Sequence, residues 1–300
     1  MSWNLCRWVW RVASPLFVGS TPSGALNRCR LYVPARPLWG ALTAELARQE
    51  ASGDPDYAGI GEMIRDHTRL SYLYPAEVIH GGWCAWLPQY REGEGLCWVR
   101  EDNDAHRISD RRFRRRLLWA RSGTAIVPDS DSAREGSLRE TECVQPFWRQ
   151  GDDSQTAPVE PVAMAGYILF KESGPEERIR PIARLFVGGD TRYGLGRLER
   201  ESMEPAATFF GMEVELDQDE PRVVAEYLPA HAHDTEADLS GNQEAIGGWD
   251  MAKGQCDPRI SGPVWMPGSR WTGDADIPAW NLQPTGMLRM ARAEKRADPS

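Results

Sequence analysis

The chain has 300 residues, of which 41% are hydrophobic and 26% are charged, and its formal net charge is −9 at pH 7. This length and composition are typical of a globular protein with a sizeable core, built as one large domain or two small ones. The negative charge argues against nonspecific electrostatic coating of nucleic acid, although a local basic groove is compatible with it. No run approaches eighteen apolar residues, so no membrane span is predicted.

The six cysteines are scattered along the chain without a Cys-x-x-Cys pair. This spacing matches neither a zinc site nor a small disulfide framework, so we predict buried or partly buried thiols in a reducing cytosol. The first twelve residues mix tryptophan with arginine and contain no continuous apolar core, which argues against a signal peptide. The sequence therefore predicts a cytoplasmic protein.

The basic residues are almost all arginines, since lysine occurs only at Lys171, Lys253 and Lys295 among the 35 basic positions. A GC-rich genome explains such a bias without any functional reason. Arginine is nonetheless the better residue for two-pronged contacts with phosphate. The thirteen tryptophans are expected to be core or interface anchors.

Hydrophobic periodicity near the N-terminus predicts strands and two helices. Basic and apolar residues alternate over residues 5–12 (LCRWVWRV), which is typical of a strand with one buried face. Leucines at helical spacing follow Pro37, a helix start signal, and predict a helix over residues 38–49. The other predictions here are a turn-rich loop at 14–24, a short strand at 30–33, a helix at 56–65 and a strand at 70–79.

The rest of the chain predicts mainly strands. A tryptophan-containing hairpin or insertion at 81–104 precedes residues 107–121, which hold seven arginines. Many strands and few helices favour an α+β fold with an antiparallel sheet. The further predictions are strands at 136–143 and 161–170 with a polar linker at 151–158, a helix at 175–184, strands near 211–216 and 222–228, an acidic loop at 231–244, and a segment rich in Gly, Pro and Trp at 245–271.

The most distinctive segment is residues 183–200 (ARLFVGGDTRYGLGRLER), in which a β-like apolar run leads into a glycine-rich loop. Glycine permits close backbone approach, arginine supplies forked donors for phosphate, and tyrosine offers a face for base stacking. The loop is not a Walker loop, because no Gly-Lys-Ser/Thr follows, and it fits the dinucleotide fingerprint poorly. The composition indicates a polyanion-binding loop, with a simple tight turn as the alternative.

Three separated segments carry motif-like patterns in a fixed order. Residues 14–46 contain SPLFVGS and YVPARPLWGALTAEL, residues 121–144 contain RSGTAIV and EGSLRETECV, and the glycine-rich loop follows. In order and chemistry they resemble the RAMP superfamily of CRISPR-associated proteins, the repeat-associated subunits of RNA-guided effector complexes. The positions that match the family's motifs are Pro15, Leu16, Gly19, Tyr32, Pro34, Leu38, Gly40, Ala41, Leu42, Gly123, Ala125, Leu138, Glu142, Gly188, Gly189, Arg192, Gly194, Gly196 and Arg197.

The C-terminal part of the sequence resembles one subgroup of this superfamily in particular. GGWD at residues 247–250, followed by VWMPGSRW at 264–271, is similar to the ending of the subunit group that caps the 5′ end of the guide RNA. Residues 266–269 read MPGS where that group has PAGS, which is a departure from the pattern. In type III systems the cap subunit sits against the large polymerase-like subunit.

The resemblance implies a ferredoxin-like (RRM-like) core, β-α-β-β-α-β, with an antiparallel sheet and long insertions. It implies one domain over residues 1–285, with an insertion at about 51–110, and a flexible tail at 286–300. A sheet of this kind offers a surface on which RNA can lie.

The RNA-binding residues that the resemblance implies lie mainly in the glycine-rich loop. Arg36, in the turn before the first helix, is a further candidate because a helix N-terminus favours phosphate. Arg111 and Arg115 are candidates for a guide or target channel, with a solvated face or a partner contact as the alternative. The predicted set is Gly188, Gly189, Arg192, Tyr193, Gly194, Gly196, Arg197, Arg36, Arg111 and Arg115.

No catalytic residue, metal or cofactor is predicted. His231, His233 and Asp234 form an HxHD cluster, which we interpret as a solvated loop because zinc needs about four well-placed ligands. Target-cleaving members of the superfamily carry an acidic residue before the first helix, whereas residues 14–36 contain no Asp or Glu. Asp190 is expected to order its loop through an Asx-type turn.

The sequence thus predicts a non-catalytic subunit of a CRISPR effector ribonucleoprotein that holds the guide RNA, most of all its 5′ handle. The expected partners are the guide RNA, the target RNA indirectly, and other CRISPR-associated subunits including a large polymerase-like subunit; no membrane is involved. The alternatives are a repeated backbone subunit of the same complex, a guide-processing endoribonuclease, and an unrelated soluble enzyme with a glycine-rich turn.

Overall fold

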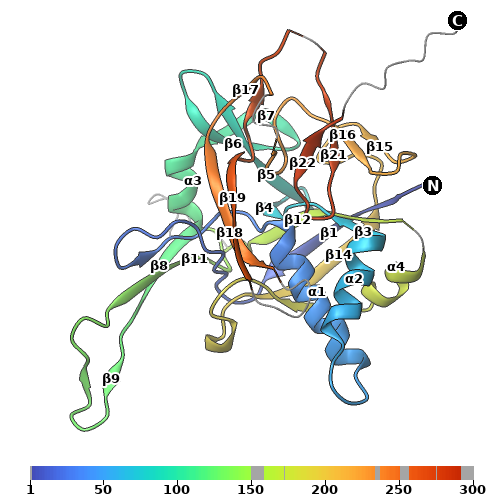
Figure 1. Ribbon diagram of the computed structural model, residues 1–300. Helices are drawn as coiled ribbons and strands as arrows, with labels where there is room; N and C mark the ends of the chain where they lie inside the picture. Colours follow the sequence, from blue (N-terminus) through green and yellow to red (C-terminus); the bar gives the residue numbers. More distant parts are fainter. Residues whose placement is uncertain are drawn as a thin grey trace, which may run out of the picture.

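The computed structural model describes residues 2–149, 159–171, 173–233, 237–250, 257–274 and 276–291. The central element of these residues is a nine-stranded antiparallel sheet (Figure 1). In spatial order its strands are β13 (Arg184–Phe186), β14 (Arg197–Pro205), β1 (Asn4–Val12), β12 (Ala163–Phe170), β4 (Tyr74–Ile79), β5 (Gly82–Arg91), β6 (Gly95–Arg100) and β7 (Asn103–Ser109), with β3 (Thr68–Leu70) also paired to β12.

A ferredoxin-like core lies in the middle of this sheet. Along the chain it consists of β1, α1 (Ala35–Glu50), β3 with β4, β12, α4 (Ser173–Ile179) and β14, which is the β-α-β-β-α-β order. In space the strands follow the order β14-β1-β12-β4, and α1 contacts α4. The structure therefore confirms the predicted α+β class, with its ferredoxin-like core, antiparallel sheet and long insertions.

Helix α1 starts earlier than the sequence predicts, at Ala35, so that Pro37 occupies its first turn. A proline is tolerated there because its missing N–H would have no partner inside the helix. The leucines at positions 38, 42 and 46 are buried, as their spacing requires. Helix α2 (Tyr57–His67) packs beside α1, where the indole N–H of Trp39 donates to the Gly61 carbonyl at 2.9 Å.

Strand β1 is covered on both faces rather than on one. Its apolar residues at both alternate sets of positions are buried, and β12 and β14 pair with its two edges. The basic residues that suggested an exposed face are instead ion-paired. Arg7 pairs with Glu101, and Arg11 pairs with Glu199 and with Glu201.

Two predicted strands differ in the structure. The strand predicted at 70–79 is divided into β3 and β4 at Ser71. The Ser71 N–H still donates to the Tyr167 carbonyl at 2.9 Å, but the Tyr167 N–H donates to the Ser71 Oγ at 2.6 Å instead of to its carbonyl. Residues 30–33 form no strand, and only Val33 pairs, through an isolated bridge to Leu73.

An arm projects from the body of the protein between β7 and β12 (Figure 1). Helix α3 (Asp110–Leu117) leads directly into β8 (Leu118–Gly123), which pairs antiparallel with β11 (Arg139–Val144). The tip carries β9 (Ile126–Val127) and β10 (Ser132–Ala133), and β2 (Leu26–Asn27) pairs parallel with β11. We call residues 118–144 the projecting arm. The linker predicted at 151–158 lies outside the described residues.

The C-terminal part adds three small sheets. They are β15 (Val214–Glu215), β16 (Arg222–Val224), β21 (Ala279–Leu282) and β22 (Leu288–Met290); β17 (Leu239–Ser240) with β20 (Arg270–Trp271); and the hairpin of β18 (Gln243–Asp250) with β19 (Asp257–Trp265). The loop predicted at 231–244 therefore contains β17 and the start of β18. Part of the tail predicted at 286–300 forms β22, and residues 292–300 lie outside the described residues.

One contiguous cluster of buried side chains extends from Trp3 to Leu288. The cysteines at positions 6, 29, 84, 97 and 143 are buried free thiols, as predicted, and Cys256 lies outside the described residues.

None of the described helices combines the length and the apolar character needed to cross a lipid bilayer.

Candidate functional site

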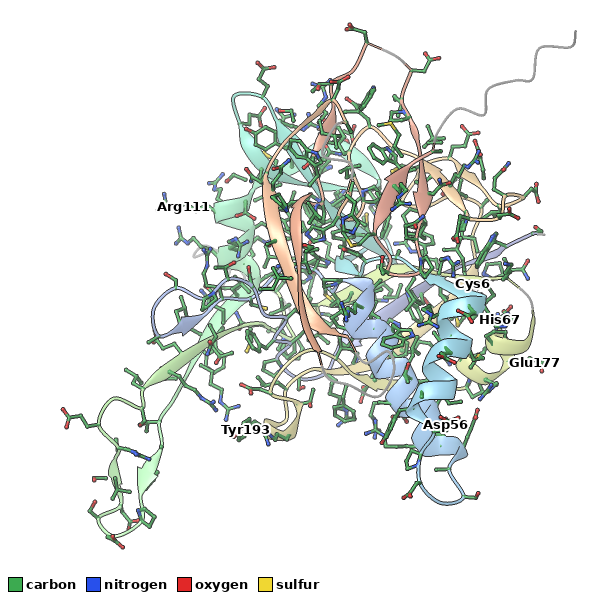
Figure 2. The ribbon with its side chains drawn as sticks, in the orientation of Figure 1. Cys6, Asp56, His67, Arg111, Glu177 and Tyr193 are labelled. Atoms are coloured by element: carbon green, nitrogen blue, oxygen red, sulfur yellow. The ribbon has the colours of Figure 1, made fainter. Side chains whose placement is uncertain are left out.

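The glycine-rich loop connects β13 to β14. Its middle is a single 3-10 turn, η1 (Thr191–Tyr193), bounded by Asp190 and Gly194 in left-handed backbone conformations with φ of 55° and 85°. Tyr193 is 54% exposed, and Figure 2 shows it at the outer end of this loop. The loop therefore presents an aromatic face to its surroundings.

Two of the loop's glycines are required by the protein's own packing. At Gly188, where φ is 88°, an added Cβ would lie 2.1 Å from the carbonyl oxygen of Phe17. At Gly196, where φ is 79°, it would lie 2.0 Å from the carbonyl oxygen of Val187. The sequence analysis explained these glycines by a close approach to a bound polyanion. At these two positions the close approach is instead to the protein's own backbone. Gly194 differs, because no atom lies within 4 Å of an added Cβ.

The glycine-rich loop rests on residues 15–19, which follow β1. The Gly189 N–H donates to the Phe17 carbonyl at 2.9 Å, and the Gly196 N–H donates to the Pro15 carbonyl at 2.9 Å. We call residues 15–19 the support segment, because the loop is hydrogen-bonded to it at both of its ends.

The support segment is also tied to the projecting arm. Leu16 and Val144 exchange two backbone hydrogen bonds of 2.9 and 2.8 Å. The three sequence segments that carry the motif-like patterns therefore meet at one place in the fold.

A cavity of about 80 Å³ lies between η1 and the base of the projecting arm. The guanidinium carbon of Arg139 lies 5.4 Å from the ring centre of Tyr193, and that of Arg192 lies 5.7 Å from it. Two cations thus flank one exposed aromatic ring at the edge of the cavity. The lining residues are Arg121, Ser122, Gly123, Arg139, Thr141, Asp190, Tyr193 and Leu195.

The charged groups around this cavity are not neutralised by one another. Within the described residues, no ion pair involves Arg121, Arg139 or Arg192. The side chain of Asp190 makes no capping hydrogen bond, so the predicted Asx-type turn does not form. Burial raises the pKa of the Cys143 thiol to about 11, and Arg121 opposes this rise while Asp190 adds to it. Arg121 and Asp190 therefore both lie close enough to Cys143 to change the pKa of its thiol.

The arginine run of α3 divides into paired and exposed side chains. Arg114 pairs with Asp110 at 2.8 Å, one helical turn away. Arg116 pairs with Glu77 of β4 at 3.4 Å. Figure 2 shows Arg111 pointing outward from α3, and β8 continues from this helix to the cavity. The exposed members, for which no ion pair occurs among the described residues, are Arg111, Arg112 and Arg115.

Two predicted contact residues are placed away from the cavity lining. Arg197 pairs with Glu199, a carboxylate that also binds Arg11. Arg36 lies against the C-terminal hairpin, since a Cβ on Gly248 would be 3.1 Å from its Nη1 atom. Neither side chain lines the cavity beside η1.

His231 is fully buried, so the prediction of a solvated HxHD loop is wrong at this residue. Its Nδ1 lies 2.7 Å from the Tyr72 hydroxyl, and its Nε2 lies 2.7 Å from Glu244 Oε1. Because a carboxylate only accepts, Nε2 carries the proton and Nδ1 accepts from tyrosine. Arg30 also pairs with Glu244. No cluster of three or more metal-ligating side chains occurs among the described residues, and Asp234 lies outside them.

This buried network predicts loss of stability in acid. Burial lowers the pKa of His231 below its usual 6.5, so the unfolded chain takes up its proton more readily and the free energy of unfolding falls as pH drops below that value. Burial alone would raise the pKa of Glu244, but hydrogen bonds from His231 and Arg30 outweigh it and lower this pKa to about 2. The stabilisation from Glu244 is therefore lost as pH falls from about 4.5 towards 2.

Urea unfolding at pH 7.0, 6.0 and 5.0 tests this expectation. The free energy of unfolding should decrease across this range in the wild type, and less steeply in His231→Gln, which has no ionisable ring. Equal slopes for the two proteins would show that His231 does not contribute.

Sequence reasoning missed Arg121, Arg139 and Thr141 as residues of the site. The antiparallel register places Arg139 opposite Gly123 and Thr141 opposite Arg121, so alternate residues of β8 and β11 share the face that lines the cavity. The sequence did contain a signal for them, because residues 121–123 (RSG) and 139–141 (RET) could have been predicted to pair as one hairpin.

No protein-family model matches the chain, and no curated protein matches it. Among solved structures, the fold is similar to a chain in a cryo-EM structure of the type III-B Cmr-beta complex bound to cognate target RNA and AMPPnP, with 12% identity and a TM-score of 0.53 over 88% of this chain and 84% of that one. A chain in the same complex bound to cognate target RNA gives 14% identity and a TM-score of 0.50 over 88% and 85%. At this identity, the likeness shows a shared fold.

Proposed function

We propose that this chain is a non-catalytic subunit of a CRISPR effector ribonucleoprotein and that it holds the guide RNA. The observation that carries the proposal is that Arg121, Arg139 and Tyr193 line one cavity, with Arg192 beside the Tyr193 ring, where the three motif segments meet. The shared fold with chains from RNA-bound complexes of type III-B supports it.

The cluster has the chemistry of a single-strand RNA contact. Forked arginine donors bind phosphate oxygens, and an exposed tyrosine face stacks with a base of any sequence. Asp190 repels phosphate, so we assign the phosphate contacts to the arginines and expect the carboxylate to accept from N–H groups of a base. Phosphate contacts then supply affinity, and stacking fixes the path of the strand.

The basic surface extends beyond the cavity, although the whole chain is acidic. Residues 107–149 contain ten arginines and six acidic residues, whereas the net charge of the chain is −9. The exposed arginines of α3, including Arg111 and Arg115, lie on the helix that leads directly into β8, the strand whose end lines the cavity. Such a local field attracts a phosphate backbone and makes the binding dependent on salt.

Within the complex, the C-terminal resemblance favours a position at the 5′ handle of the guide, docked against neighbouring subunits that include the large polymerase-like one. We propose that residues 1–285 act there as one domain in the cytoplasm. The stoichiometry of the purified complex tests this position, because a cap occurs once per guide. Several copies per guide would identify a repeated backbone subunit instead.

We propose no catalytic role, since residues 14–36 contain no carboxylate and both ring nitrogens of His231 are hydrogen-bonded in the core. A single-turnover assay on repeat RNA without metal tests this. Clean cleavage that is lost on substitution of one histidine would identify a guide-processing endoribonuclease and would overturn the proposal.

Tyr193→Ala is expected to weaken binding of single-stranded RNA by about tenfold, because base stacking on an aromatic ring contributes about 1–3 kcal/mol. Tyr193→Phe should bind almost as the wild type does, since it keeps the ring. Tyr57→Ala removes a similarly exposed tyrosine from α2 and serves as the control. Fluorescence anisotropy with labelled RNA measures all four proteins, and equal affinities for Tyr193→Ala and the control would contradict stacking at this ring.

A further inference from the structure

A largely buried ion pair joins the C-terminal hairpin to Arg30, a residue that contacts the support segment of the glycine-rich loop. Glu244, on β18, pairs with Arg30, and their side chains are only 15% and 11% exposed. The carboxylate also accepts from His231 at 2.7 Å and from the Tyr32 hydroxyl at 3.3 Å. Three donors thus fix this one carboxylate, and through it the position of the arginine.

Arg30 also forms hydrogen bonds to the support segment. Its Nε donates to the Gly19 carbonyl at 3.2 Å, and its backbone N–H donates to the Val18 carbonyl at 2.7 Å. Because the guanidinium is planar and rigid, the contact of Nη1 with Glu244 determines where Nε points. Without the carboxylate, the guanidinium would keep only neutral acceptors, the Tyr32 hydroxyl and the Gly19 carbonyl. We expect this poorly compensated cation to turn towards solvent and to loosen its contact with Gly19.

The support segment in turn holds the glycine-rich loop. The Phe17 carbonyl accepts the Gly189 N–H at 2.9 Å, two residues from the carbonyl that Arg30 binds. Gly188 abuts the same Phe17 carbonyl so closely that the two cannot shift independently. A continuous set of contacts therefore runs from β18 to η1, through one side chain and one short segment.

We propose that Glu244 is a positioning residue for the glycine-rich loop, so that the C-terminal hairpin sets the geometry of the cation–aromatic cluster. The placement of the loop does not depend on any ligand. The consequence for RNA binding rests on the proposed function.

Amide hydrogen exchange on the full chain tests the placement directly. Glu244→Ala should increase the exchange rate of the Gly189 amide by about tenfold, because its acceptor on the support segment becomes mobile. The Gly196 amide should change less, since its acceptor on Pro15 lies beyond the bridge between Leu16 and Val144. Glu244→Gln, which keeps an acceptor for Arg30, should fall between the wild type and the alanine variant.

Glu220→Ala is the matched control. Glu220 binds Arg69 through two contacts of 2.6 and 2.8 Å, and Arg69 is even less exposed than Arg30, but no contact of that pair reaches the support segment. This variant should lose stability without a selective change at Gly189. If the exchange rate of the Gly189 amide increased equally in Glu220→Ala and Glu244→Ala, general destabilisation would explain the effect. That result would overturn the proposal.

RNA affinity gives the second readout, measured well below the unfolding temperature of each variant. Glu244→Ala should bind single-stranded RNA several-fold more weakly than Glu220→Ala. If the wild type binds no RNA, the proposed function fails, whereas the exchange measurement still decides the positioning role. If Glu244→Ala does not fold, Glu244→Gln decides: an unchanged Gly189 exchange rate in that variant would overturn the proposal.

Discussion

Replacing Arg139 and Arg192 together by alanine is expected to weaken the binding of single-stranded RNA by about 100-fold or more. Each arginine flanks the exposed ring of Tyr193, and neither takes part in an ion pair among the described residues, so both are available for phosphate. A hydrogen bond to a charged group contributes about 1.5–3 kcal/mol, which makes the loss of two such contacts large. Anisotropy titrations from 50 to 200 mM salt measure the effect.

The salt dependence separates a lost phosphate contact from a lost fold. For single-stranded RNA, the slope of log affinity against log salt should become shallower by about 0.7 for each contact removed. The double variant Arg184→Ala with Arg289→Ala is the control, because it removes the same charge from exposed positions that neither line the cavity nor contact the Tyr193 ring. The same loss in both double variants would assign the effect to net charge and contradict a specific site.

Gly188→Ala is expected to lower the free energy of unfolding by about 3 kcal/mol or more. A left-handed backbone costs a residue with a side chain about 1–2 kcal/mol, and here φ is 88°. The new methyl group would also lie 2.1 Å from the Phe17 carbonyl oxygen, so the loop must leave the support segment. Urea unfolding measures the stability, and RNA affinity should fall with it because η1 moves.

Gly194→Ala measures the cost of backbone strain without a steric clash. Its φ of 85° is almost the same as that of Gly188, but no atom lies within 4 Å of the added Cβ. This variant should therefore lose only about 1–2 kcal/mol, the cost of the left-handed backbone. Equal losses for the two variants would show that the contact with Phe17 does not hold the loop.

The elements that local pattern determines were predictable from the sequence. Helix α1 follows from the spacing of Leu38, Leu42 and Leu46 after Pro37, and β1 follows from its alternation. The alternation nevertheless predicted one exposed face. This prediction was wrong because basic residues also lie on a covered face when a carboxylate from elsewhere in the chain pairs with them. Arg7 finds that partner in Glu101, 94 residues away along the chain.

The composition of the site was partly predictable, and its geometry was not. The glycine-rich loop could be recognised from Arg192 and Tyr193, but Arg139 is joined to that ring only by the pairing of β8 with β11 and the docking of this arm on the loop. Local composition was also misleading at His231, which stands just before a polar stretch in the sequence. Its burial depends on Tyr72, a hydrogen-bond partner 159 residues away.

Photo-crosslinking tests the central claim most directly. The full chain is bound to single-stranded guide RNA that contains 4-thiouridine, irradiated, digested and mapped by mass spectrometry. Binding at the cation–aromatic cluster predicts crosslinks in the peptides that contain Tyr193 and the facing strands β8 and β11, and their loss in the variant without Arg139 and Arg192. Crosslinks confined to other parts of the protein, with none at η1 or the base of the projecting arm, would contradict it.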